Sequence, residues 1–171
     1  MRPFILSLAV AVLALTAPLS AQAGDYGPKP NIAMAAKGGW WDADVNGFSG
    51  GPAYGLELSA DDIWSEMPAG KLRHMLSWNH ADSDGLKLDS AEWNLHWVFQ
   101  SNSGVWIGAG PGLGYVWADG KDLDDGIGVQ FGVSATYIQG HALFGIESRY
   151  QWTEAESANN WLTMAKIGYA F

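Results

Sequence analysis

The chain has 171 residues, enough for a single domain, and a formal net charge of −9. That acidity argues against nucleic acid as a partner, because surfaces that bind nucleic acid are basic. The absence of cysteine excludes disulfides, thiolate metal ligands and cysteine nucleophiles. We predict no cofactor and no metal site as the primary interpretation of the sequence.

Residues 1–23 have the pattern of a signal peptide. Arg2 precedes an apolar run over 4–15, and Ala21 and Ala23 form a small-x-small cleavage site. The run is too short for a spanning helix, which needs ~20 apolar residues. A retained membrane anchor is the alternative, and the short run and the cleavage site both disfavour it. We therefore predict an exported domain over residues 24–171.

Four segments at the start of this domain alternate with a period of two residues. They cover 31–41, 52–60, 71–79 and 92–100. In the third segment, Leu72, Leu76 and Trp78 occupy one phase, while Arg73 and Ser77 occupy the other. Alternation of this kind predicts a strand with one apolar and one mixed or polar face.

Four later segments follow the same rule and cover 105–117, 126–137, 143–152 and 161–171. In the sixth segment, for example, Phe131 and Val133 alternate with Gln130 and Ser134. Eight such segments of about ten residues, separated by turn-type residues, are typical of a membrane barrel. The predicted fold is all-β: an eight-stranded antiparallel up-and-down transmembrane β-barrel.

An even number of strands places both chain ends on one side, which we predict to be the periplasm. The periplasmic turns are then predicted at 61–70, 101–104 and 138–141. The outer loops are predicted at 42–51, in the segment that begins HADSDG (80–85), at 118–126 and at 153–160. A closed barrel leaves no strand edge unpaired.

Aromatic side chains gather at both ends of the predicted strands. Such girdles are expected in a bilayer, where amphipathic rings sit at the level of the lipid headgroups. The predicted partners are therefore outer-membrane lipid and lipopolysaccharide. The predicted outer girdle contains Trp40, Trp41, Tyr54, Trp78, Tyr115, Trp117, Tyr150, Trp152 and Trp161, and the inner girdle contains Trp97, Phe99, Trp106, Tyr137, Tyr169 and Phe171.

The signal peptide, the segment GAGPGLGYVW, the eight short strands and the terminal Tyr-x-Phe resemble the small OmpA-like, opacity-protein type of outer-membrane barrel. The resemblance implies that the last strand carries a signal read by the barrel-insertion machinery, with Trp161, Ile167, Tyr169 and Phe171 as its residues. Roles within this family include adhesion, envelope integrity, lipid modification and leakage of small solutes. The fold alone does not choose among them.

The strand residues that alternate with the apolar ones are predicted to line a polar interior. Eight strands enclose a space just wide enough to be filled by side chains. Three carboxylates and four cations nearly balance there, so we predict a plug of ion pairs and hydrogen bonds, with a polar pore as the alternative. The residues of this interior network are Lys37, Glu57, Arg73, Glu92, Asn94, His96, Gln130, Glu147, Arg149 and Lys166.

Two further features belong to the fifth segment. Gly108, Gly110, Gly112 and Gly114 are predicted to leave room for long side chains, and their spacing does not match a phosphate-binding loop. Pro111 has no N–H to donate, so we expect a bulge or a missing ladder bond at this residue.

An enzymatic site is the main alternative to a structural role. His80, Asp82, Ser83 and Asp84 lie in a predicted outer loop, although neighbouring loop residues rarely supply the geometry of an activated serine. His74, on the lipid phase, is expected to snorkel towards an interface. The acidic segment 118–126 favours a solvated loop, with a divalent cation or an extracellular ligand as the alternative.

We therefore predict an outer-membrane barrel of structural or surface-interaction type, for envelope integrity or adhesion. A lipid-A-modifying enzyme and a weak small-solute channel are the alternatives.

Overall fold

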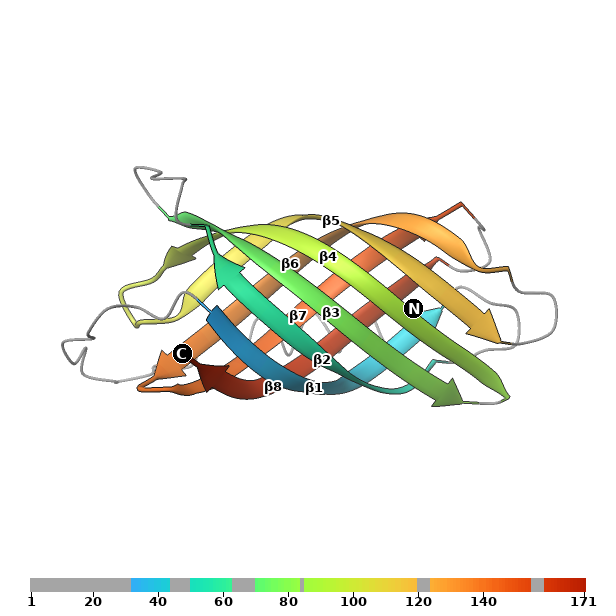
Figure 1. Ribbon diagram of the computed structural model, residues 1–171, viewed down its shortest axis with the longest axis horizontal. Coiled ribbons are helices and arrows are strands. Elements are labelled where there is room, and N and C mark those ends of the chain that lie inside the picture. Colours follow the sequence, from blue (N-terminus) through green and yellow to red (C-terminus); the bar gives the residue numbers. More distant parts are fainter. Residues whose placement is uncertain (1–31, 44–49, 63–69, 84, 120–123, 155–158) are drawn as a thin grey trace.

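The computed structural model of the protein describes residues 32–43, 50–62, 70–83, 85–119, 124–154 and 159–171. The predicted signal peptide lies outside these residues. The described residues form eight strands (Figure 1), and none of their segments is a helix long and apolar enough to cross a membrane. The strands are β1 (Ile32–Ala43), β2 (Gly51–Asp61), β3 (Lys71–Ser83), β4 (Leu86–Gln100), β5 (Trp106–Asp119), β6 (Gly126–Gln139), β7 (Ala142–Thr153) and β8 (Asn160–Ala170).

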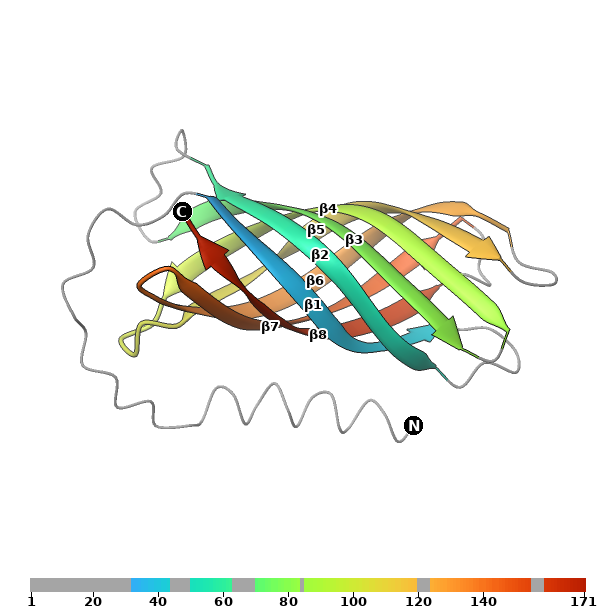
Figure 2. The ribbon, with the colours of Figure 1, turned by 60° about the horizontal axis from the view of Figure 1, so that its bottom comes forward.

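The eight strands form one closed antiparallel barrel, which confirms the predicted fold. Each strand pairs with its neighbours in sequence, and β1 pairs with β8 to close the sheet (Figure 2). Closure gives every strand two partners, so no edge is left unpaired. At the end of the barrel where β1 begins and β8 ends, the Phe171 amide donates to the Ile32 carbonyl at 2.9 Å. We call this the terminal end and the other the opposite end.

The pairing register is staggered around the barrel. Following paired inward-facing residues once around the sheet returns to β1 ten residues further along, which defines a shear number of ten. A fixed stagger tilts the strands and sets the width of the interior, which eight strands make just wide enough for side chains. The path runs through Ala33, Ser59, Met75, Asn94, Gly112, Gln130, Gln151, Asn160 and Ala43.

Two predicted connections are shorter in the structure. β3 continues to Ser83 and β4 begins at Leu86, so the prediction of an outer loop at 80–85 is wrong. Gly85, with a φ of 78°, takes up the tight turn that this leaves. β6 likewise continues to Gln139, so the predicted turn at 138–141 shortens to 140–141. In both places the alternation between inward and outward side chains continues beyond the predicted strand end, and the backbone pairing of the two strands continues with it.

The predicted turn at 101–104 is present, where the Gly104 amide donates to the Ser101 carbonyl at 3.0 Å. The first predicted periplasmic connection and the first predicted outer loop lie largely outside the described residues, as do the middle of the acidic segment 118–126 and the middle of the loop at 153–160.

Pro111 interrupts one ladder without shifting it. The pairing of β4 with β5 omits Leu95 with Pro111 and His96 with Gly110, yet the same register continues on both sides of this gap. On its other side, Pro111 is paired with Phe131 of β6. Of the two expected outcomes, the structure therefore shows a local loss of pairing and no bulge, because the missing N–H interrupts only the ladder towards β4.

The outward face of the barrel is apolar around the sheet. Most predicted girdle residues lie on this face, but Trp41 and Trp106 are buried inside the barrel, and their assignment to the girdles is wrong. Both tryptophans stand in the inward phase of their strands, with Lys37 and with Gly108 respectively. Position near a strand end had suggested a girdle, whereas the phase decides which face a side chain occupies.

Candidate functional site: the barrel interior

The interior is filled by polar side chains that the alternating strands direct inward. Nine of the ten residues predicted for this network are buried, and Glu147 is half-buried with them. Each of the ten takes part in a hydrogen bond or an ion pair. Apart from the bond between His96 and Ser134, these contacts divide into three clusters along the barrel axis.

The first cluster, which we call the seam cluster, contains Lys37, Glu57, Glu147 and Lys166. The Lys37 ammonium lies 2.7 Å from Glu147 and 3.9 Å from Glu57. The Lys166 ammonium lies 2.8 Å from Glu57 and 3.2 Å from Glu147. Lys37 also donates to the Ser77 hydroxyl at 3.0 Å. Two cations and two carboxylates thus neutralise one another inside the barrel, which buried charges require.

The second cluster is built around Glu92, which forms an ion pair with Arg149. Glu147 and Arg149 stand in the same phase of β7, but the stagger brings Arg149 to Glu92 of β4. The Glu92 carboxylate also accepts hydrogen bonds from Ser90 at 2.5 Å and from Asn79 at 2.8 Å. Further amides complete the Glu92 cluster; they belong to Asn94, Gln130, Gln151 and Asn160.

Towards the opposite end, apolar side chains fill the interior above the Glu92 cluster. Trp41 is the largest of them, and its ring lies 5.6 Å from the Arg149 guanidinium. A cation beside an aromatic face is an attractive pairing, which is stronger away from water. This apolar plug contains Trp41, Ala43, Ala53, Ala81, Leu86, Leu88, Val116, Leu162 and Met164.

The third cluster lies at the terminal end and includes residues that the sequence analysis missed. Asp61 pairs with Lys71 and accepts a 2.6 Å hydrogen bond from Arg73. The ring of Trp106 lies 4.4 Å from the Lys71 ammonium. Asp61 had been assigned to a connection, although it continues the inward phase of β2 through Glu57 and Ser59. That phase was the signal that could have placed it inside.

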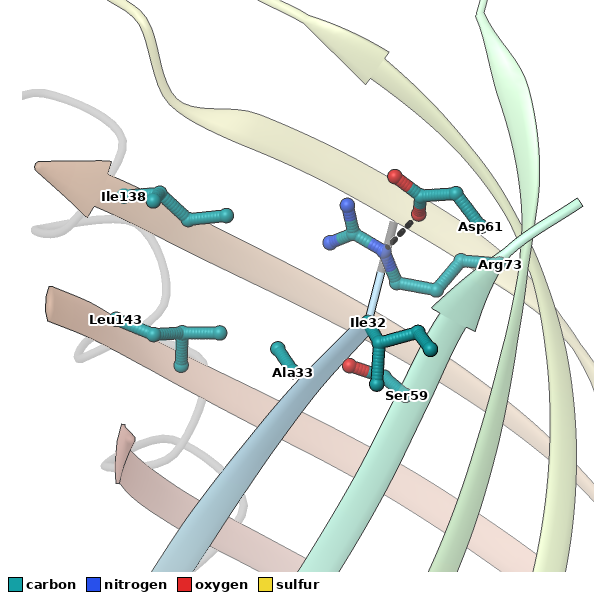
Figure 3. Close-up of a pocket in the computed structure, with 7 residues that line it drawn as sticks. All are labelled: Ile32, Ala33, Ser59, Asp61, Arg73, Ile138 and Leu143. Atoms are coloured by element: carbon teal, nitrogen blue, oxygen red, sulfur yellow. Dashed lines mark hydrogen bonds and ion pairs between the residues drawn. The ribbon is translucent and has the colours of Figure 1, made fainter. Parts of the chain in front are cut away.

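A small cavity adjoins this terminal cluster. Figure 3 shows the Arg73 guanidinium, bonded to Asp61, pointing between the two walls of this pocket. One wall is polar, with Ser59, and the other is apolar, with Ile138 and Leu143. Its volume of about 10 Å³ accommodates about one water molecule, so it is too small for an organic ligand.

Inward glycines make room for these side chains. A Cβ placed on Gly114 would lie 2.6 Å from the Gln151 amide nitrogen, and one on Gly145 would lie 3.0 Å from the Lys166 side chain. At Gly110 the obstacle is the Leu95 carbonyl, at 2.0 Å. In the fifth segment, Gly114 thus leaves room for a long side chain, as predicted, whereas Gly110 allows the close approach of a neighbouring backbone.

The histidines do not form a hydrolytic triad in the part of the chain that the structure describes. His80 bonds Asp89 at 3.0 Å, and Ser83 lies in the opposite phase of β3. His96 bonds Ser134 at 2.9 Å inside the barrel, and none of the described carboxylates hydrogen-bonds its other ring nitrogen. A serine nucleophile needs both a base and a group that orients it.

On the outward face, where it was expected to snorkel towards an interface, His74 has an aromatic partner. It stacks on Trp93 and accepts a 3.3 Å hydrogen bond from the indole N–H, so two polar groups on the outward face bond each other. Within the described residues, no group of three or more His, Asp and Glu side chains could hold a metal ion.

No protein-family model and no curated protein matches the sequence, but solved structures match the fold. Neisserial surface protein A has a TM-score of 0.58 and 15% identity, with 82% of this chain and 97% of that chain covered. For OprG of Pseudomonas aeruginosa the values are 0.56 and 14%, with coverage of 85% and 98%. For Ail, the attachment invasion locus protein of Yersinia pestis, they are 0.51 and 12%, with coverage of 84% and 98%.

At these identities the likeness concerns the fold. It agrees with the closed eight-stranded barrel described above. This chain has the fold of the small eight-stranded outer-membrane β-barrels, as its sequence resemblance implied.

Proposed function

We propose that this protein is an outer-membrane β-barrel of structural or surface-interaction type, which serves envelope integrity or adhesion and has a plugged interior. The observation that carries the proposal is the inverted distribution of polarity in the barrel. Lys37, Glu92 and Arg149 are buried inside it, while Leu56, Ile167 and Phe171 are each 60% exposed on the outside.

A bilayer accounts for the apolar outward face. Soluble monomers rarely expose contiguous apolar patches larger than a few hundred Å². Here exposed apolar and aromatic side chains occur on all eight strands, including Met34, Leu58, Leu76, Leu113 and Val129. Lipid chains cover such a face without another protein, and a closed barrel presents no open sheet edge to hydrocarbon.

The interior favours a closed structure over a channel. Three polar clusters and the apolar plug succeed one another along the axis, and they involve side chains from all eight strands. An aqueous path would have to separate ion pairs that neutralise one another in a low dielectric. Separation of such pairs is costly, because it leaves buried charges without partners.

A role in surface interaction requires that one end of the barrel faces the periplasm and the other faces the cell exterior. We assign the terminal end to the periplasm, since the C-terminal strand with Trp161, Ile167, Tyr169 and Phe171 is the segment proposed to meet the insertion machinery. The opposite end, with the acidic residues near Asp119, then faces lipopolysaccharide and extracellular ligands. Two of the similar structures are named as a surface protein and an attachment protein.

Single-cysteine labelling tests both location and orientation, because the natural chain has no cysteine. Lys87→Cys places an exposed thiol near the opposite end, and Ser103→Cys places one in the turn at the terminal end. In intact cells, an impermeant maleimide should label Lys87→Cys, and it should label Ser103→Cys only after the outer membrane is permeabilised. Equal labelling of both, or recovery of the protein without membranes, would contradict the proposal.

Two assays on the refolded protein separate the alternatives. We expect no sustained conductance in planar bilayers and no turnover of lipid A or phospholipid. Steady channels would favour the pore, and turnover that is lost in His80→Ala would favour the enzyme.

A further inference from the structure

We propose that Lys37, Glu57, Glu147 and Lys166 form a crossed clasp that holds the seam between β1 and β8 closed. This is the seam at which the first and last strands of the chain meet (Figure 2). The inference concerns the mechanics of the barrel and does not depend on the proposed function.

Two like charges lie directly opposite each other at this seam. Lys37 of β1 is the register partner of Lys166 of β8, and both side chains point inward and are buried. Like charges in direct cross-strand positions are destabilising, and a low dielectric strengthens their repulsion. By itself, therefore, this lysine pair would push the closing strands apart.

The two glutamates come from the strands that flank the seam and reach across it. Glu57 of β2, next to β1, lies closest to Lys166 of β8, at 2.8 Å. Glu147 of β7, next to β8, lies closest to Lys37 of β1, at 2.7 Å. Each carboxylate also contacts the lysine on its own side, at 3.9 and 3.2 Å respectively. Each glutamate thus bridges both lysines, and the two bridges cross.

Glycines beside the lysines allow the strands to approach closely. Gly39 follows Lys37 by two residues, and a Cβ there would lie 1.9 Å from the Thr163 carbonyl oxygen of β8. Gly168 follows Lys166 by two residues, and a Cβ there would lie 2.0 Å from the Met34 carbonyl oxygen of β1. The backbones of β1 and β8 are therefore closely packed on both sides of the lysine pair.

The first test removes the carboxylate charges with Glu57→Gln/Glu147→Gln. Hydrogen–deuterium exchange of the refolded protein in detergent should accelerate at least about tenfold in β1 and β8. The reason is that Lys37 and Lys166 would stay buried and opposed without the carboxylates that neutralise them. Exchange in β4 and β5 should change much less. If exchange accelerates equally in all strands, or stays unchanged at the seam, the clasp is excluded.

The matched control is Glu92→Gln. It also removes a buried carboxylate that is paired with a cation, but Glu92 and Arg149 join β4 to β7 and do not bridge the seam. Exchange should then accelerate most in β4 and β7. In β1 and β8 the acceleration should stay well below that of the double variant, because Arg149 reaches β8 only through its hydrogen bond to Asn160. If Glu92→Gln opens the seam as strongly as the double variant does, the effect is one of general destabilisation and the proposal fails.

A rescue variant distinguishes repulsion from simple loss of packing. Lys37→Met/Lys166→Met in the Glu57→Gln/Glu147→Gln background removes the opposed charges and should restore slow exchange at the seam. If the seam exchanges as fast as without rescue, lysine repulsion is not its cause. Folding is checked by gel electrophoresis, in which a folded barrel runs at a different position before and after boiling. Should the double variant lose this shift, the single variant Glu147→Gln replaces it in the test, because it retains Glu57 on both lysines. Accelerated seam exchange in that single variant supports the clasp, and parental exchange excludes it.

Discussion

Gln130 and Phe131 are neighbours in β6, yet their side chains occupy opposite environments. Gln130 is 2% exposed and donates hydrogen bonds to Glu92 and Asn94 inside the barrel. Phe131 is 50% exposed on the outward face. The same pairing of environments recurs along the other strands. One step along the chain therefore exchanges a polar interior for an apolar exterior, and the cost of a substitution depends more on phase than on position.

The largest effect is expected inside, where one partner of a buried ion pair is removed. Arg149→Met should lower the free energy of unfolding by about 3–5 kcal/mol, because Glu92 would keep a buried charge without its cation. Denaturant unfolding in lipid vesicles measures the change. Lys87→Met, on an exposed lysine near the rim, is the control and should stay within about 0.5 kcal/mol. Equal losses of unfolding free energy in the two variants would mean that water reaches the interior and solvates Glu92.

The second-largest effect is expected when a charge is placed on the apolar outward face. Phe131→Arg places a charge in the hydrocarbon region and should cost ~2–4 kcal/mol in the same measurement. Gln130→Arg, one residue away, should cost less, because the new cation would point towards Glu92. If Gln130→Arg is the more harmful of the two, the assignment of faces is reversed.

The third effect tests whether the two faces differ in free space. Gly114→Leu should destabilise by about 1–3 kcal/mol, since its side chain would overlap Gln151 and Glu92. Ala109→Leu, on the exposed outward face of the same strand, adds the same kind of side chain towards lipid and should be tolerated. Thermal unfolding, with the two variants compared in one detergent, gives the contrast, and equal melting temperatures would argue against close packing inside.

The smallest effect concerns a polar contact on the apolar face. His74→Phe keeps an aromatic ring beside Trp93 but removes the acceptor for its indole N–H. We expect a loss of about 1 kcal/mol, the net value of a single hydrogen bond. Leu76→Phe, two residues away and exposed, serves as the control in the same unfolding measurement. No difference between the two variants would mean that the Trp93 bond contributes nothing.

The alternation of residues along each strand can be read from the sequence, and where it was used it assigned side chains to the correct face. It placed Glu92, Gln130 and Lys166 inside the barrel before any contact was known. Trp41 and Trp106 were misplaced because their height along the strand was given more weight than their phase, although Trp41 alternates with Trp40 in the same way as Lys37 alternates with Gly38. Asp61 was missed because the second predicted strand ended too early, and Ser90 was missed because the fourth predicted strand began too late.

The fold and the face of nearly every strand residue follow from the sequence, because alternation is a local property of an extended backbone. The ion-pair partners follow only from the three-dimensional arrangement: Arg149 pairs with Glu92, and Glu147 with both lysines of the seam. Those contacts join residues from strands that are far apart in the chain. Which of them meet depends on the stagger summed over all eight registers, and no single segment carries that sum.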